Sequence, residues 1–106
     1  MVKVMFNSLK SKLTTPVTLK HFLRRDGAGN KLFSGTEEIG AYIVTKDEVV
    51  VNSKGAEVVS NTQVYIDGAT NISKLDNIVL FEEEYEVQSL STFFWNNTPD
   101  IKVVYI

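Results

Sequence analysis

The chain has 106 residues, a net charge of −2 and no cysteine. A chain of this length normally folds as one domain, and without cysteine it forms neither disulfides nor thiolate metal sites. No apolar run approaches the ~20 residues that span a bilayer, and residues 2–6 are too short for the apolar part of a signal peptide. We therefore expect one folded domain that stays in a cytoplasm-like setting and does not enter a membrane.

The charge is unevenly distributed along the chain. Residues 1–25 contain six basic side chains and no acidic one, a charge of +6, whereas residues 26–106 carry −8. The basic segment is either an arm that meets nucleic acid or an acidic partner, or a solvated terminus. The acidic remainder argues against a body that binds nucleic acid.

Residues 1–16 are predicted to form an N-terminal arm. In the stretch NSLKSKLTTP, Asn7 or Ser8 is a suitable cap for a short helical turn, and Pro16 ends it. The few apolar side chains cannot stabilise such a helix in isolation, so we expect the arm to be mobile or docked on a neighbour.

Residues 17–106 show a β pattern. Alternating apolar residues mark short strands, and turn residues separate them, as in RRDGAGN and in NSKG at residues 52–55. The expected strands are residues 17–23, 39–45, 48–51, 56–67, 77–81, 84–90 and 101–106. Six or seven short strands predict an all-β fold, a small single-domain barrel of the SH3 or OB kind. We expect a long hairpin, at about residues 46–57, to project from this barrel.

The C-terminal residues IKVVYI are apolar on both faces of an extended strand. The alternation gives two sets, Ile101, Val103 and Tyr105 on one face and Val104 and Ile106 on the other. Such a strand is typically covered on both sides, so we expect an interior strand of the barrel or one covered by a neighbouring subunit. The aromatic run at residues 93–95 cannot all face one core, so at least one ring faces outward or contacts another chain.

Catalytic chemistry finds little support in the sequence. The single histidine, His21, lies in an expected strand beside apolar residues, without an acidic partner or a metal-ligating cluster at a telling spacing. The carboxylates of residues 82–86 (EEEYE) are either a site for a hard cation or a solvated turn, and they lack the spacing of a calcium loop. We therefore expect no enzymatic activity, no cofactor and no metal.

The order and spacing of several stretches resemble one protein family. They are VTLKHF, the RDGAGN turn, the hairpin with KGAEVVSNTQVYIDG, the LDNI lead-in, the YEV strand and the closing VVYI. Over about residues 17–106 the chain resembles the head-closure, or head–tail joining, proteins of long-tailed bacteriophages, also described as minor capsid or head completion proteins. Leu75 and the three glutamates after Phe81 depart from the family's Gly or Pro and from its tighter glycine turn. This puts the shape of that loop in question.

The resemblance implies a structural protein of the virion that is assembled in the host cytoplasm. Such proteins are small β-barrels that form a homo-oligomeric ring, by resemblance a dodecamer. The ring lies below the portal and adaptor proteins and above the tail-completion or tail-tube proteins. It closes the exit channel for double-stranded DNA, which passes without sequence readout, and it provides the docking surface for the tail.

The resemblance also suggests roles for particular residues. The hairpin tip, Asn52, Ser53, Lys54 and Gly55, corresponds to a gate in the channel, and Gly55 and Gly68 are candidate hinges between open and closed states. Contacts between subunits and rings are expected on the arm and the aromatic segment, at Leu9, Leu13, Phe93, Phe94, Trp95 and Asn96. Because Lys54 is the only basic residue at the tip, a steric gate is expected rather than a grip on DNA.

Two other functions stay open at this point. A tail-completion protein at the same interface differs from a head-closure protein only in its position in the particle. A stand-alone SH3- or OB-like module would bind a peptide or single-stranded nucleic acid. That module is expected to be a monomer with a ligand groove lined by residues 93–95.

Overall fold

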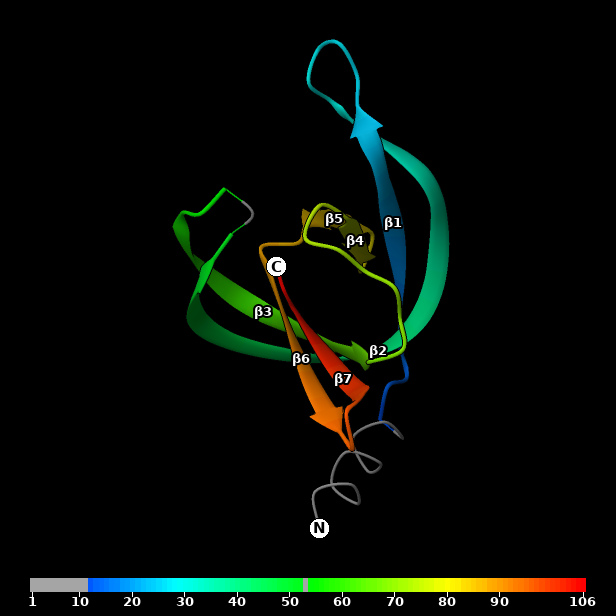
Figure 1. Ribbon diagram of the computed structural model, residues 1–106, viewed down its shortest axis with the longest axis vertical. Coiled ribbons are helices and arrows are strands. Elements are labelled where there is room, and N and C mark those ends of the chain that lie inside the picture. The colour runs from blue at the N-terminus through cyan, green and yellow to red at the C-terminus, as the bar shows by residue number, and fades with distance from the viewer. Residues whose placement is uncertain (1–11, 53) are drawn as a thin grey trace.

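The computed structural model describes residues 12–52 and 54–106, which form seven strands in one antiparallel sheet (Figure 1). The strands are β1 Thr15–Arg25, β2 Lys31–Val51, β3 Glu57–Asp67, β4 Asn77–Leu80, β5 Glu83–Glu86, β6 Ser89–Trp95 and β7 Thr98–Tyr105. Their order in the sheet is β5-β4-β1-β2-β3-β7-β6. The predicted all-β class is confirmed. Within the described ranges, no helix has the length and apolar character needed to cross a membrane.

The prediction of a closed barrel is wrong. β5 and β6 stand at the two ends of the hydrogen-bonded order, and only Val87 and Gln88 separate them in the chain. The backbone turns a corner at these two residues, where the Val87 N–H donates to the Asp76 carbonyl and the Gln88 N–H to the Tyr105 carbonyl. The single strand predicted at residues 84–90 is therefore two diverging strands, and the sheet stays open.

β2 links the two halves of the sheet. Its first part pairs with β1 and its last part with β3, and its ribbon bends around the molecule between the two (Figure 1). A bulge between Thr45 and Glu48 interrupts the pairing with β3, and such bulges increase the local bend and twist. The sequence predicted a start at residue 39 instead of Lys31. Residues 31–38 lack apolar alternation because most of them are exposed on both faces.

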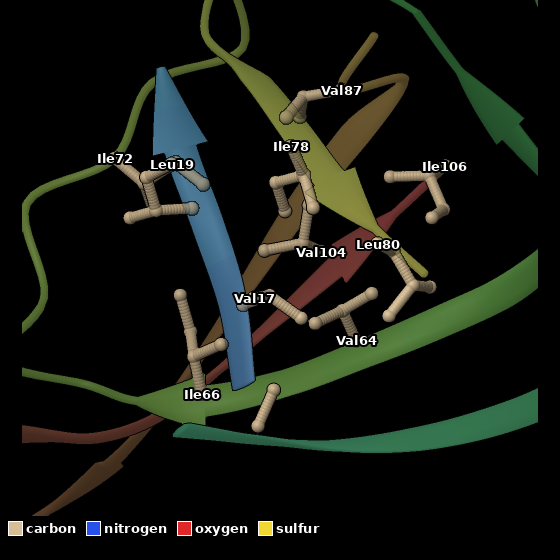
Figure 2. Close-up of a cluster of buried hydrophobic side chains, with 11 residues drawn as sticks. Val17, Leu19, Val64, Ile66, Ile72, Ile78, Leu80, Val87, Val104 and Ile106 are labelled. Carbon is tan, nitrogen blue, oxygen red and sulfur yellow. The ribbon is translucent and has the colours of Figure 1, made fainter. Parts of the chain in front are cut away.

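The main core lies inside the bend of the sheet. Figure 2 shows side chains of β1 and β4 pointing toward those of β3 and β7. Leu19, Ile78 and Val64 are fully buried there. Because alternate residues of a strand share a face, each strand contributes alternate residues to this cluster, and each buried aliphatic side chain stabilises the fold by about 1.5–3 kcal/mol.

β7 is buried on both faces, as its sequence predicted. Val104 faces the main core, and a second cluster lies on the opposite face, made of Ile101, Val103, Tyr105 and Val50. The partly buried Leu13 packs against that second cluster. Since β7 pairs with β3 on one side and β6 on the other, the predicted interior position is confirmed, and residues of this same chain contribute to the cover on both faces.

Two tight turns close the hairpins β4–β5 and β6–β7. Phe81 and Glu82 in the first turn have positive φ angles, as do Asn96 and Asn97 in the second. Positive φ at both central residues is the geometry of a type I′ turn, which suits the twist of the flanking strands. Asparagine tolerates this conformation, whereas it strains a bulky residue such as phenylalanine. The loop whose shape was in question is therefore tight although it contains no glycine.

Close packing against β7 requires a glycine at position 68. The Gly68 N–H donates to the Asp100 carbonyl, and a β-carbon at Gly68 would lie 2.6 Å from the Pro99 backbone and 2.7 Å from that of Asp100. Lack of space therefore accounts for this glycine, and its predicted role as a hinge stays a prediction.

Gly68→Ala should lower the free energy of unfolding by about 1–3 kcal/mol, the usual cost of extra atoms in a packed site. The measurement is urea unfolding followed by tryptophan fluorescence. Gly35→Ala is the matched control, because nothing lies within 4 Å of a β-carbon there, and it should change stability by less than about 0.5 kcal/mol. Similar losses in both variants would contradict this account of Gly68.

Candidate functional site

The tip of the β2–β3 hairpin is an ordered turn organised by Asn52. Its backbone N–H donates to the Ala56 carbonyl, and its own carbonyl accepts from the Gly55 N–H. The Asn52 side-chain Oδ1 accepts from the N–H groups of Lys54 and Ala56, both at 3.0 Å. Gly55 has a φ of 80°, a conformation that glycine adopts without strain. Ser53, also predicted for the gate, lies outside the described residues.

The tip of the β1–β2 hairpin repeats the same arrangement with Asp26 in place of Asn52. The Asp26 N–H donates to the Asn30 carbonyl, and its carbonyl accepts from the Gly29 N–H. Oδ1 accepts from the N–H groups of Ala28 and Asn30, both at 2.9 Å. The hydrogen bond from the Asn30 backbone is the main reason that the pKa of Asp26 lies below its ordinary value. The two hairpins thus end in equivalent turns, one held by a titratable carboxylate and the other by an amide that does not titrate.

Four hydrogen bonds hold each tip, which argues against Gly55 as a flexible point. The positive φ of Gly55 is needed to close the turn. We expect each hairpin tip to move as a unit, with any bending located in the strands below it. The predicted hinge at Gly55 stays a prediction.

Acid should loosen the Asp26 tip and leave the Asn52 tip unchanged. A lowered pKa in the folded state means that the stabilisation is present above the ordinary aspartate pKa, about 4. It is lost as the pH falls through the lowered value. The protection factors of the Ala28 and Asn30 amides, which are corrected for the intrinsic pH dependence of hydrogen exchange, should fall below about pH 4, whereas those of Lys54 and Ala56 stay unchanged.

The control for this experiment is Asp26→Asn, which copies the other tip and should abolish the response to acid. Equal responses of the two tips in the wild-type protein would show that the Asp26 carboxylate does not hold its turn.

The β2–β3 hairpin has one buried and one exposed face. Val50 and Val58 pair with each other and pack against the second cluster beside β7. On the opposite face Val49 pairs with Val59, and their side chains are 61% and 67% exposed. Val51, two residues nearer the tip and therefore on the same face, is 50% exposed. We call these three exposed valines the valine face.

The aromatic segment before β7 is at the edge of the sheet. Phe93 is 45% exposed and Phe94 59% exposed, and a bulge between them shifts the pairing of β6 with β7. The prediction that at least one of these rings faces outward is confirmed. Asn96 lies in the type I′ turn. Trp95 pairs through its backbone with Thr98, and its side chain lies outside the described structure.

The remaining predicted contact residues belong to the N-terminal segment. Leu13 packs within its own chain against the second cluster, which accounts for its apolar character without a partner subunit. Leu9 lies outside the described residues. Contact with other subunits stays a prediction for both.

His21 lies between two carboxylates that the sequence did not connect with it. Its Nε2 is 3.1 Å from Glu37 Oε1, and its Nδ1 is 3.4 Å from Asp76 Oδ2. The buried Asp76 carboxylate also accepts from the N–H of Phe22, at 2.7 Å, and from the N–H and hydroxyl of Ser73. Phe22 lies at a bulge of the β1–β2 ladder. A bulge leaves a backbone N–H without its partner in the ladder, and here Asp76 accepts the hydrogen bond from the Phe22 N–H.

The contacts of Asp76 hold two parts of the backbone together. The Ser73 hydroxyl donates to Asp76 and not to His21, so no activated nucleophile results. Asp76 instead ties the loop before β4 to the bulge of β1, which explains why an ionisable residue is buried there. A shallow depression around His21, about 430 Å³ in volume, is lined by Ser34, Glu37 and Asn71 among others.

The β-strand alternation places Glu83 on the opposite face of β5 from Glu84 and Glu86. Glu84 contacts Lys20 Nζ at 2.8 Å and Asn77 Nδ2 at 2.7 Å. The hydrogen bond from Lys20 is the main reason that its pKa is lowered. Glu83 accepts from the Tyr85 hydroxyl instead. Within the described ranges, no group of three or more His, Cys, Asp or Glu is placed to hold a metal ion.

A polar pocket lies where the sheet is left open. It has a volume of about 150 Å³ and reaches from the corner at residues 86–88 to the tip of the β2–β3 hairpin. Four basic side chains line it: Arg25 and Lys31 at the two ends of the β1–β2 turn, Lys54 in the β2–β3 hairpin and Lys74 in the loop before β4. Among the described residues, Glu86 is the only acidic one in its lining. We call this feature the basic pocket.

The basic pocket could not be predicted from the sequence, because no local sequence motif marks its residues. In chain order, each of the four cations is separated from the next by between 6 and 23 positions, and none of them belongs to a recognisable motif. Only the curl of the sheet brings both hairpins and the loop before β4 together. Lys54 is the one basic residue in the sequence of the hairpin tip, but in the folded chain it lies near Arg25, Lys31 and Lys74.

The sequence matches no protein-family model, and no curated protein is significantly similar to it. The resemblance to bacteriophage head-closure proteins therefore rests on the sequence pattern.

Proposed function

We propose that the protein is a structural connector subunit of a tailed bacteriophage. In this proposal copies of the chain form a ring, by resemblance a dodecamer, below the portal and adaptor proteins. The ring closes the DNA exit channel and provides the docking surface for the tail. The observation that carries the proposal is the β2–β3 hairpin, one face of which packs on its own core while the other presents the valine face to solvent.

The valine face supports assembly because exposed apolar β-branched side chains gain free energy when covered. Val49 and Val59 are directly opposite each other across the hairpin, so they form a continuous apolar surface with Val51. Covering one such side chain contributes about 1.5 kcal/mol. Exposed patches of this kind mark interaction sites in folded proteins.

The edge strand β6 supplies a surface of a different kind for the neighbouring copy. It is the last strand of the sheet and pairs only with β7 among the described strands, so its outer edge offers backbone groups to another chain. Phe93 and Phe94 add exposed aromatic surface there. A hairpin on one copy that contacts an edge on the next is a heterologous contact, and repeated contacts of this type close into rings.

In this ring the tip at residues 52–55 reaches into the channel as a steric gate. The hydrogen-bonded turn suits a rigid obstacle, and the bulge between Thr45 and Glu48 supplies a point below the tip at which the hairpin bends. DNA passes such a gate without sequence readout. The gate opens by a movement of hairpins and needs no chemical step.

Two alternative functions can be distinguished by the assemblies with which the protein purifies and by its oligomeric state. A tail-completion protein would use the same surfaces but would purify with tails rather than with filled heads. A stand-alone SH3- or OB-like module would remain a monomer, and its exposed aromatic residues would bind a peptide or a single strand of nucleic acid.

Val59→Lys should remove the protein from assembled particles, because a lysine there introduces a charge into a contact that excludes water. The measurement is an immunoblot of purified particles produced with the variant as the only copy. The variant should keep its melting temperature within a few degrees, since Val59 is 67% exposed.

Leu23→Lys is the matched control, because Leu23 is a similarly exposed aliphatic residue, at 56%, on the β1–β2 side of the molecule. It should be incorporated normally. Normal incorporation of Val59→Lys, or equal loss of both variants, would argue against the valine face as the contact.

A further inference from the structure

The curl of the sheet explains where the basic pocket lies, but neither the fold nor the proposed ring explains why its lining is positively charged. Its lining includes the corner at Val87 and Gln88, where the chain passes from β5 to β6. The pocket's basic side chains come from the β1–β2 hairpin, the β2–β3 hairpin and the loop before β4. A fold has no need to gather like charges from separate segments, since they repel each other.

Two of the four cations are engaged by the protein itself. The Lys31 side chain is only 11% exposed, and its Nζ donates to the Leu75 carbonyl at 2.9 Å and to Asn77 Oδ1 at 3.0 Å. The Glu86 carboxylate is 3.6 Å from Lys31 Nζ but is itself 65% exposed, so it offsets this charge only in part. Arg25 donates to the Gly29 carbonyl at 3.0 Å, a neutral partner.

The side-chain ammonium groups of the other two, Lys54 and Lys74, have no hydrogen bond or ion pair within the described ranges. Neutral donors accompany them. Because Asn52 Oδ1 is taken up by two backbone N–H groups, the Asn52 side chain has its NH₂ group left to donate. Gln88 also lines the pocket. The pocket thus combines an excess of about three positive charges with amide groups, in a space that admits a small ion.

We propose that the basic pocket binds a phosphate group. Phosphate carries up to two negative charges and several strong acceptor oxygens, which match lysine ammonium groups and amide donors. A volume of about 150 Å³ accommodates one such group with water but not a stretch of duplex. The group is either inorganic phosphate or a phosphate of a nucleic-acid strand. This inference does not depend on the connector function, because it rests on the side chains of one chain.

The test is isothermal titration calorimetry of the full chain with inorganic phosphate at low ionic strength, with chloride as the reference anion. Wild-type protein should show one saturable site for phosphate and none for chloride. Lys54→Gln and Lys74→Gln should each weaken binding by about threefold or more, the loss expected for one partly solvated charge. The double variant should weaken it by about tenfold.

Lys46→Gln is the matched control, because Lys46 is exposed on β2 and does not line the pocket. It makes the same change in net charge and should leave phosphate affinity unchanged. Absence of saturable phosphate binding, or equal weakening by Lys46→Gln and Lys54→Gln, would overturn the proposal. Circular dichroism of each variant establishes that it is folded.

A second titration distinguishes the two sources of the group. A short single-stranded oligonucleotide is added at the same total phosphate concentration as in the first titration. Tighter binding of the oligonucleotide that is lost in the Lys54→Gln, Lys74→Gln double variant would assign the site to a nucleic-acid strand. Binding of inorganic phosphate alone, with the same sensitivity to the two lysines, would assign it to a small free anion.

Discussion

The burial of β7 on both faces is the constraint on which the rest of the structure depends. A central strand with apolar residues on both sides needs cover in two directions. Val104 is covered by the curled half of the sheet that carries β1 and β4, whereas Ile101 and Val103 are covered on the other face, where the β2–β3 hairpin contributes Val50. One long strand, β2, belongs to both halves, because it bends between the part that pairs with β1 and the part that pairs with β3 (Figure 1).

The surfaces that bear on function follow from this arrangement. Because Val50 and Val58 of the hairpin face the second cluster, their neighbours Val49 and Val59 must face outward. The chain corner at residues 87–88 leaves β5 and β6 as the two edge strands of the described sheet and opens the site of the basic pocket. The valine face, the β6 edge and the pocket are thus consequences of a sheet that curls without closing.

The sequence predicted what local patterns encode, namely the all-β class, the two-sided C-terminal strand and the hairpin at residues 46–57. It did not predict the opening of the barrel, because a break at residues 87–88 in a run of strand-like residues depends on hydrogen bonds to Asp76 and Tyr105, which are distant in the chain. For the same reason it missed the partners of His21 and the gathering of four cations. These features depend on contacts between residues far apart in the chain, whereas the strands can be predicted from the periodicity of apolar residues.

In the proposed function, the protein closes the DNA exit of a phage head and joins the head to the tail. The most direct measurement is electron microscopy of particles assembled in the host with and without this protein. The account predicts that particles made without it fill with DNA but lose it, and that they lack tails. Tailed particles that retain their DNA in the absence of the protein would contradict the account and favour a stand-alone binding module.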